Sequence, residues 1–404
     1  MRFNRNGLLS LLILWGATFV YRQFQGGFVS NFLFYAITSL SLLEIWIWMG
    51  TRGKVVVERR LSKKQLKDGE RLDVDLFLSF HGFFPFLFVT VVDPLPPALG
   101  GLTEGNQIWK LLLFRRNIRF SYVLAPVPRG EHSFTEVWME WSDLFGFFHR
   151  RIILPLPDQI LVFPSYDEVR SFPTINEKNA GLTFALRRSS EDVALVMGIR
   201  DYAAGDRLNR IHWKATARTG ALKTKEFEVH VTNDFLLFPD CTQKGYAGKS
   251  DDFERSIRLA ATLVRYSVKN GYHVGLSLYQ KERIFVPLGQ NSDHEIRLFT
   301  QLARAKAVSL YPFPRQLVDQ MAYIPYGTTV VIITPQWDQE MMKALSIMRM
   351  RKLSLEFFLV APRMPEGAPA FFIKEGISYH LLDKRPIEVI LKGGVGDGER
   401  AIPY

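Results

Sequence analysis

Two apolar runs near the N-terminus constrain the fold of this 404-residue chain more than any other feature. The first run, residues 7–21, is short, and the second, residues 28–50, reaches the roughly twenty apolar residues with which a helix crosses a bilayer. Spanning by the first run would require Arg22 and Gln23 to reach toward the interface. Together the runs predict a transmembrane hairpin over residues 1–52. A signal peptide is the alternative interpretation, but no small-residue cleavage site precedes the second run.

Basic residues flank this predicted hairpin on both sides. Arg2 and Arg5 precede it, and only Arg22 lies between the two runs. The cations that follow it are Arg52, Lys54, Arg59, Arg60, Lys63 and Lys64. The positive-inside rule therefore places both ends of the hairpin in the cytoplasm, so we expect a plasma-membrane protein whose soluble domains face the cytoplasm. Glu44, near the end of the second run, is interpreted as a polar contact between helices, with an ion pathway as the alternative.

The formal net charge of +11 favours anionic partners. Membrane lipids suit a basic domain that is tethered at an anionic bilayer surface, and an acidic protein surface is equally compatible with the charge. Nucleic acid is an unlikely partner, because acidic residues are interleaved with the basic ones and no known nucleic-acid-binding module is visible. The single cysteine, Cys241, excludes an internal disulfide and fits a reducing cytosol.

Short alternating runs separated by Gly and Pro fill residues 53–165. Residues 72–78 and 120–124 alternate apolar and polar side chains, which is typical of half-buried strands. The pattern predicts an Ig-like β-sandwich domain. No catalytic constellation occurs there, so we expect a spacer or docking module.

Residues 233–404 alternate strand-like and helix-like segments, the pattern of a doubly wound α/β domain. The expected strands are residues 235–238, 274–278, 329–334 and 353–360. The expected helices are residues 252–269, a helix that begins at Ser292 with a capping box to Glu295, and residues 336–350. Ligands of such sheets bind at the carboxyl ends of the strands, so the loop after Phe238 is the first place to look for a site.

The most distinctive segment lies between these domains, in the predicted linker of residues 166–232. From Arg200 to Arg218 it concentrates cations, carboxylates and aromatic residues. Asp206 as N-cap and Gly220 as C-terminal stop predict a short helix with a basic face. We expect Arg200 and Arg218 to pair with Asp201, Asp206 or Glu226 and to clamp the domains together.

The same segment carries a resemblance to a known family. Arg200-Asp201-Tyr202, Gly205-Asp206, Arg210, Trp213-Lys214 and Arg218 resemble the signature of the bacterial domain of unknown function 58 family. Arg129-Gly130 and Asp143-Leu144-Phe145-Gly146-Phe147 fit the family too, with Leu144 in place of Pro. The resemblance covers most of the chain and implies a membrane protein with a von Willebrand factor A-like domain at residues 233–404. Such proteins are usually encoded near MoxR-type AAA ATPases, so it also implies a partner, but no reaction.

The resemblance bears on metal binding as well. In von Willebrand factor A-like domains the loop after the first strand carries an Asp-x-Ser-x-Ser metal motif, and the corresponding positions are Asp240, Thr242 and Lys244. Lys244 replaces the last ligand, and its ammonium could take the place of a divalent ion. Pro335 stands where such domains often supply another Asp. We therefore expect no tightly bound metal and no other cofactor, with weak Mg²⁺ binding at Asp240 and Thr242 as the alternative.

The sequence is compatible with two functions. Asp201, Asp206 and His212 could perform acid–base chemistry, so a phosphate-handling or cell-wall-related hydrolase is the alternative. No P-loop, Rossmann fingerprint, Gly-x-Ser-x-Gly or His-Glu-x-x-His motif occurs. We expect a non-enzymatic membrane-anchored adaptor that engages a MoxR-type AAA ATPase or its client complex. The residues expected to hold its domain seam are Arg200, Asp201, Tyr202, Gly205, Asp206, Arg210, Trp213, Lys214 and Arg218.

Overall fold

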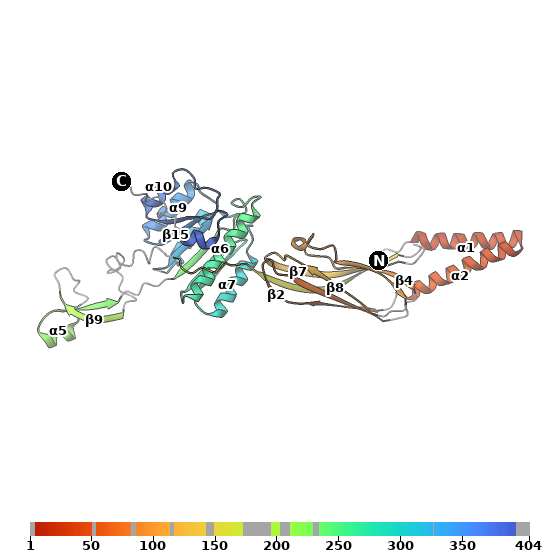
Figure 1. Cartoon of the computed structure of the whole chain (residues 1–404), viewed down its shortest axis with the longest axis horizontal. Coiled ribbons are helices and arrows are strands. Elements are labelled where there is room, and N and C mark those ends of the chain that lie inside the picture. Colours follow the sequence, from red (N-terminus) through yellow and green to blue (C-terminus); the bar gives the residue numbers. More distant parts are fainter. Residues whose placement is uncertain are drawn as a thin grey trace. The chain divides into compact units, whose positions relative to one another are not determined.

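The computed structural model describes residues 5–50, 54–81, 86–113, 117–142, 149–172, 195–202, 211–228, 234–325 and 327–392 (Figure 1). The chain divides into two compact units, Met1–Pro164 and Ser165–Tyr404. In its described residues, the first unit contains two α-helices and two β-sheets. The second contains a six-stranded mixed sheet with helices, and a two-stranded sheet with the short helix α5 (Trp213–Thr219).

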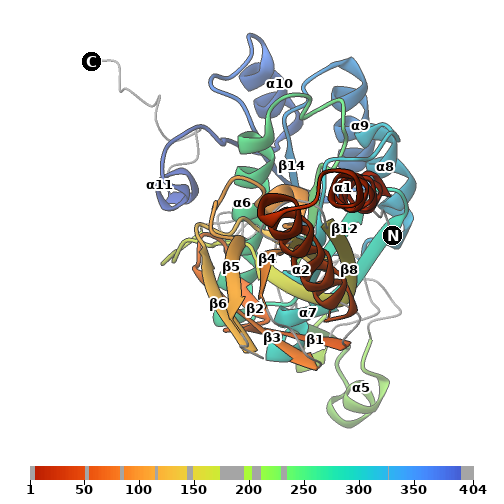
Figure 2. The same ribbon diagram turned by 90° about the vertical axis from the view of Figure 1, so that its right-hand side faces the viewer.

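Helices α1 (Arg5–Gln25) and α2 (Phe28–Gly50) form at the two apolar runs, and α2 has the predicted limits. The two helices lie next to each other in the views of Figures 1 and 2. The indole Nε1 of Trp15 on α1 donates a hydrogen bond to Thr38 Oγ1 on α2, at 3.1 Å. Phe34 of α2 is buried, and its ring centre lies 5.9 Å from that of Trp15. Arg22 on α1 also donates from Nε to Asn31 Oδ1 on α2, at 2.9 Å. Aromatic packing and polar contacts at two places thus join the described parts of the pair.

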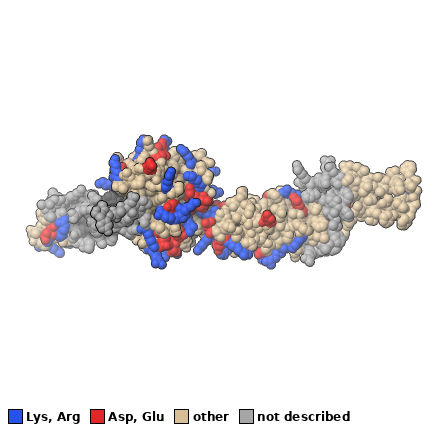
Figure 3. Space-filling model, turned by 45° about the horizontal axis from the view of Figure 1, so that its top comes forward, with Lys and Arg blue, Asp and Glu red and all other residues tan. Residues whose placement is uncertain are grey.

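The outer sides of this helix pair are apolar. Phe24 and Phe28 are 88% and 84% exposed, and Figure 3 shows the helices as a mostly uncharged surface. Among the described residues, one stretch, Phe28–Trp46, is long and apolar enough to cross a membrane by length and composition. Exposed apolar surface of this kind marks an interaction site, which indicates membrane association. The transmembrane hairpin of both helices stays a prediction, because α1 does not meet the same criterion.

The β part of the first unit consists of two sheets. Its strands are β1 (Lys54–Leu61), β2 (Gln65–Lys67), β3 (Leu72–His81), β4 (Phe86–Val92), β5 (Gln107–Leu113), β6 (Asn117–Leu124), β7 (Gly130–Ser142) and β8 (His149–Phe163), with a 3-10 turn at Pro97–Leu99. One sheet has the order β1-β3-β6, and the other has the order β2-β8-β7-β4-β5. All neighbours are antiparallel except β2 and β8.

Alternation along the strands builds one apolar core from both sheets. Leu72 and Leu76 of β3 are fully buried, as are Val137 and Met139 of β7 in the other sheet, and all four belong to one cluster. Inward apolar and outward polar residues are what the sequence of residues 53–165 predicts. An Ig-like arrangement of the two sheets stays a prediction.

A buried ion pair lies within this β unit. Arg59 on β1 donates from Nη2 to Asp93 Oδ1 at 2.7 Å and from Nε to Asp93 Oδ2 at 3.0 Å, and neither side chain is exposed. Its Nη1 donates to the carbonyl of Leu156 at 2.8 Å and to Asp158 Oδ2 at 3.2 Å. Tyr122 donates its hydroxyl to Asp93 Oδ2 at 2.7 Å. Each charge is thus met by an opposite charge and by further hydrogen bonds.

The second unit is built on a mixed sheet with the order β13-β12-β11-β14-β15-β16. Its strands are β11 (Phe235–Pro239), β12 (Val274–Tyr279), β13 (Arg283–Gly289), β14 (Thr329–Thr334), β15 (Ser354–Leu359) and β16 (Ser378–Leu381). Neighbouring strands are parallel except β13, which runs antiparallel to β12. The four central strands occur where the sequence predicts them, and β14 has the predicted limits.

Helices cover the sheet on both faces. They are α6 (Ser250–Lys269), α7 (Ser292–Arg304), α8 (Phe313–Gln320), α9 (Gln339–Met350), α10 (Ala368–Glu375) and α11 (Ile387–Lys392), with a 3-10 turn at Met321–Tyr323. On one face Val330 and Ile332 of β14 pack with residues of α8, α9 and α10 in one cluster. Helix α6 contacts β11, β12 and β14. A mixed α/β unit with buried parallel strands is therefore confirmed.

Three local predictions about helix starts are corrected. Helix α7 begins at Ser292, but its N-cap is Asn291, whose side chain accepts from His294 N at 2.8 Å. Glu295 instead accepts hydrogen bonds from Arg265, so the predicted capping box is absent. Helix α9 begins at Gln339, because Asp338 caps it. The remaining correction concerns the signature helix.

Candidate functional site

The signature helix is shorter than the sequence predicts. Ile211 forms an isolated β-bridge with Thr224, so the described helix α5 begins only at Trp213. Its N-cap is His212, whose Nδ1 accepts from Ala215 N at 3.1 Å, and not Asp206. The C-terminal stop at Gly220 is confirmed by its left-handed backbone, with φ of +69°.

The helix is attached to a two-stranded antiparallel sheet, β9 (Leu195–Asp201) and β10 (Lys223–Glu228). Asp201 accepts a charged hydrogen bond from Lys223 Nζ at 2.7 Å, although its own side chain is 78% exposed. The next residue, Tyr202, donates its amide to the carbonyl of Leu222 at 3.0 Å. These contacts join the end of β9 to the start of β10.

The partner recorded for the Asp201 carboxylate is thus Lys223, and not the Arg200 or Arg218 of the expected clamp. Arg200 donates from Nη1 to the backbone carbonyl of Asp201 at 3.0 Å. Arg218 lies exposed at the end of α5. The role of these residues in a domain seam therefore stays a prediction.

Several signature side chains are exposed on this small element. Trp213 is 66% exposed, and Lys214 beside it is exposed as well. Gly205, Asp206 and Arg210 lie outside the described residues, and so does the resembling segment 143–148. The part of the signature that the structure describes therefore presents an indole and two cations, Lys214 and Arg218, on one seven-residue helix.

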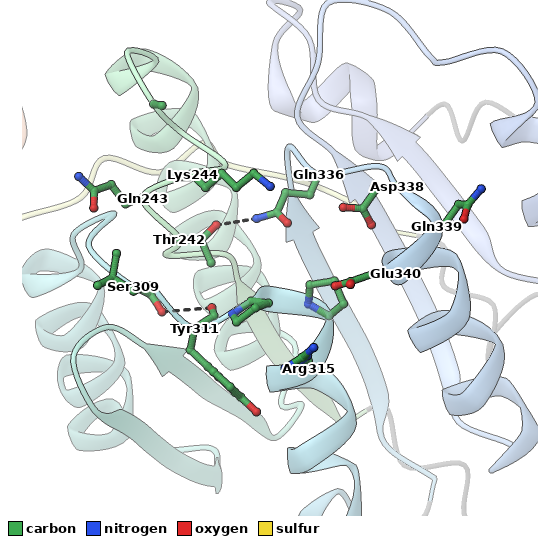
Figure 4. Close-up of a pocket in the computed structure, with 14 residues that line it drawn as sticks. Thr242, Gln243, Lys244, Ser309, Tyr311, Arg315, Gln336, Asp338, Gln339 and Glu340 are labelled. Carbon is green, nitrogen blue, oxygen red and sulfur yellow. Dashed lines mark hydrogen bonds between the residues drawn. The ribbon is translucent and has the colours of Figure 1, made fainter.

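The second candidate region is the loop after β11. Asp240 is fully buried, and its Oδ1 accepts from the backbone N of Thr242 at 2.7 Å. Its Oδ2 accepts from Thr334 Oγ1 at 2.7 Å and from Gln336 Nε2 at 3.0 Å. The same Gln336 nitrogen lies 2.6 Å from Thr242 Oγ1 (Figure 4). Both carboxylate oxygens are thus occupied by donors of this chain, in an arrangement called here the Asp240 cage.

Gln336, and not Lys244, occupies the space between the carboxylate of Asp240 and the hydroxyl of Thr242. The ammonium of Lys244 was expected in that place, but Lys244 lines the neighbouring pocket, and in Figure 4 its side chain extends toward Gln336. Among the described residues no group of three or more His, Cys, Asp or Glu side chains is placed to hold a metal ion. In this arrangement the amide nitrogen of Gln336, which is a hydrogen-bond donor, faces the acceptor oxygens of Asp240 and Thr242.

Gln336 was missed because no motif marks it. Thr334 and Gln336 follow strand β14, which adjoins β11 in the sheet. Since neighbouring parallel strands bring their carboxyl ends together, residues just after residue 334 could have been predicted to meet Asp240.

Burial changes the acidity of the cage. Burial raises the pKa of Asp240 from 3.8 to about 6, although the hydrogen bonds from Thr242, Thr334 and Gln336 act in the opposite direction. The carboxyl group is nevertheless shielded from solvent, so its altered pKa is a property of the fold and gives no accessible acid or base.

An open pocket of about 920 Å³ lies beside the cage, at the carboxyl edge of the sheet. Its lining mixes apolar residues, such as Leu310 and Pro314, with charged groups of both signs. Lys244 and Arg315 contribute cations, and Asp338 and Glu340 contribute carboxylates (Figure 4). A mixed lining of this kind suits a polar protein segment better than a single type of small ion.

Substitution of Gly245 by Ala is expected to disturb the cage. A Cβ at this position would lie 2.9 Å from Thr242 Oγ1 and 3.0 Å from Gln336 Nε2. Since both atoms are held by hydrogen bonds, we expect a loss of about 1–3 kcal/mol in the free energy of unfolding of the α/β unit. Denaturant unfolding measures this loss, with Lys244→Ala as the exposed neighbouring control. Equal stability of Gly245→Ala and the native protein would show that Thr242 and Gln336 can shift to make room for the Cβ at little cost.

Comparison with known proteins gives the family. Residues 198–366 match the model of the family described as "Protein of unknown function DUF58". The protein YeaD of Bacillus subtilis (strain 168), described as uncharacterised, is 30% identical over 370 residues, which cover 84% of this chain and 91% of YeaD.

Solved structures give weaker similarities. An aerotolerance-related membrane protein from Bacteroides fragilis NCTC 9343 is 15% identical, with 40% of this chain and 95% of that chain covered and a TM-score of 0.30. A von Willebrand factor type A structure from Catenulispora acidiphila is 10% identical, with 42% and 41% covered and a TM-score of 0.29. These scores carry no assignment of fold. The extent of the similarity to YeaD and the match over residues 198–366 do assign the family: the chain belongs to the DUF58 family.

Proposed function

We propose that this chain is a non-enzymatic, membrane-anchored adaptor that binds a partner protein through the signature helix α5. The observation that carries the proposal is the 66% exposure of Trp213 between His212 and Lys214, with Arg218 one turn further along. Exposed Trp and Arg side chains are the residue types that contribute most of the binding energy in protein interfaces. The exposed indole of Trp213 is apolar surface that a partner can bury.

A von Willebrand factor A-like role of the α/β unit is part of the same proposal. The pocket beside the Asp240 cage offers a second contact surface, whose cations and carboxylates can be matched by opposite charges on a partner. The family resemblance suggests a MoxR-type AAA ATPase, or its client complex, as that partner.

Catalysis is less well supported than binding. Of the three residues of the alternative hydrolase, Asp201 is held by Lys223, and His212 uses its Nδ1 to cap α5. Asp206 lies outside the described residues. A general base needs a free acceptor near its substrate, and Nδ1 of His212 is already in use.

Anchoring rests on α1 and α2. The apolar surface of these helices and the span Phe28–Trp46 support insertion in a bilayer. The basic residues that flank the helices support a cytoplasmic location of both units. An adaptor held in this way would bring its partner to the membrane surface.

Trp213→Ala tests the proposed interface. We expect it to weaken binding of the purified full-length chain to the MoxR-type ATPase of the same organism by about 30-fold, the value for a central aromatic residue of an interface. Surface plasmon resonance in mild detergent measures the affinity, and Arg218→Ala should weaken it as well.

Trp109→Ala is the matched control, because Trp109 lies in the β unit and is 75% exposed. It should bind like the native chain. Affinity purification from native membranes measures whether an AAA ATPase copurifies with the native chain. The ATPase should not copurify with Trp213→Ala. If no ATPase binds at all, or if both Trp variants bind equally, the signature helix is not the interface.

A further inference from the structure

A second crevice, of about 440 Å³, lies elsewhere on the α/β unit. It is lined by residues of α6, of the segment just before α11, of the first turn of α11 and of the chain at residues 167–168. Four of the lining residues are cations: Arg255, Arg258, Lys384 and Arg385. No signature residue and no residue of the Asp240 cage takes part, so it is separate from the proposed partner site.

The carboxylates of this crevice are paired with particular cations. Asp167 accepts from Arg258, and Asp383, next to the crevice, accepts from Arg385 at 2.8 Å. Glu168 pairs with Lys269 at 3.0 Å and Glu388 with Lys392 at 2.6 Å. Among the described residues no ion pair is recorded for Arg255 or Lys384. Two positive charges in the crevice are therefore left without an anion in contact.

Arg255 is the clearer of the two cases of a cation without an ion pair among the described residues. Its Nη2 donates to the backbone carbonyl of Arg385, while its Nε is shielded from solvent and has no hydrogen-bond partner among the described residues. Partial burial lowers the pKa of Arg255, and the neighbouring Arg258 adds to this effect, while Asp383, Asp167 and Asp252 act in the opposite direction. A guanidinium in this position gains from an anion placed beside it.

The crevice has room for more than a single carboxylate. A neighbouring hollow of about 550 Å³ shares Glu168 and Glu388 with it and adds Arg170 and Lys269. Volumes of several hundred Å³ are typical of small-molecule sites. A multivalent oxyanion can accept hydrogen bonds from a guanidinium and an ammonium at the same time. No described carboxylate that lines the crevice forms an ion pair with both Arg255 and Lys384.

We propose that this crevice binds the phosphate group of a small soluble ligand, with Arg255 and Lys384 as its main contacts. The ligand would neutralise the two uncompensated cations and join α6 to the segment that precedes α11. The proposal does not depend on the adaptor function, because it uses neither α5 nor the pocket at the Asp240 cage.

Isothermal titration calorimetry of the full-length chain in detergent tests it, with inorganic pyrophosphate as the probe. We expect saturable binding of the native chain and at least tenfold weaker binding of both Arg255→Gln and Lys384→Gln. The exposed Lys384 serves as the second variant in case Arg255→Gln alters folding, which circular dichroism would detect. Arg283→Gln is the control, because Arg283 lies exposed on β13 and should leave binding unchanged.

Three results would overturn the proposal. They are the absence of saturable heat with the native chain, equal affinities of the native chain and Lys384→Gln, and equal weakening by Arg283→Gln. A lipid phosphate is a different source of the same chemistry. Binding to vesicles that contain phosphatidic acid, lost with Lys384→Gln and accompanied by no pyrophosphate binding, would replace the soluble ligand by a membrane lipid.

Discussion

Arg59→Met is expected to lower the free energy of unfolding of the β unit by about 3–5 kcal/mol, the cost of breaking a buried ion pair. The substitution leaves Asp93 fully buried, with Tyr122 as its remaining hydrogen-bond donor among the contacts recorded. It also removes the guanidinium from the carbonyl of Leu156 and from Asp158. A buried carboxylate without its cation is much less stable than one exposed to water.

Arg60→Met is the matched control, because Arg60 is the next residue on β1 and its side chain is 63% exposed. Its ion-pair partner among the described residues is Glu58 at the surface, and its guanidinium carbon lies 4.8 Å from the ring centre of Phe77. Loss of these exposed contacts should change the unfolding temperature little. Differential scanning calorimetry of the detergent-solubilised chain should show a fall on the order of 10 °C or more for Arg59→Met.

The double variant Arg59→Met with Asp93→Leu separates the unpaired charge from lost packing, since an apolar pair should recover part of the stability. An unfolding temperature equal to that of Arg60→Met would instead show that the buried pair contributes nothing measurable to stability.

The same Arg59 shows why sequence predicts elements better than contacts. In the sequence it is one of several cations that follow the apolar runs, and nothing distinguishes it from Arg60. Its partner Asp93 is 34 residues away and Asp158 is 99 residues away, so the pair exists only once the two sheets have formed. Alternation along β1 predicts which side of a strand is inside, but not which inward charge finds a partner.

Continuous apolar runs were predicted well for a physical reason. Strand β14 and helix α2 have the predicted limits, because every residue of β14 is buried and most of α2 lies in the apolar stretch Phe28–Trp46. Strand β13 was missed, because it is an antiparallel edge strand with exposed alternate residues and contains Pro287. Edge strands bury less and therefore leave a weaker pattern.

The sequence predicted where the candidate site lies, but not which side chain contacts Asp240 and Thr242 there. The sequence located Asp240 and Thr242 at the carboxyl edge of the sheet, yet attributed the stabilising group to Lys244. The group that actually contacts both residues is Gln336, 96 residues after Asp240. The extent of the signature helix was wrong for a related reason, because the β-bridge of Ile211 to Thr224 outweighs local helix propensity.

The stability of the α/β unit is expected to fall as the pH rises from about 4 to about 6, because of Asp240. Burial raises the pKa of this carboxyl group in the folded protein to about 6, whereas its ordinary value is 3.8. Between these values the folded state holds a proton that the unfolded state has lost, so raising the pH favours unfolding. The stabilisation is complete below pH 4 and is lost by about pH 6. The shift of about two pKa units corresponds to about 3 kcal/mol.

Asp240→Asn should remove this pH dependence, because Asn keeps an acceptor oxygen for the amide of Thr242 but has no ionisable proton. Denaturant unfolding between pH 4 and pH 7 should therefore show the stability of the variant gaining on that of the native chain by about 3 kcal/mol as the pH rises. Asp251→Asn, at an exposed position in the first turn of α6, is the control and should keep the native slope. A native slope in Asp240→Asn would mean that the cage holds its carboxylate ionised throughout, with the donors of Thr242, Thr334 and Gln336 outweighing the cost of burial. That outcome would make the cage a site that holds an ionised carboxylate inside the fold.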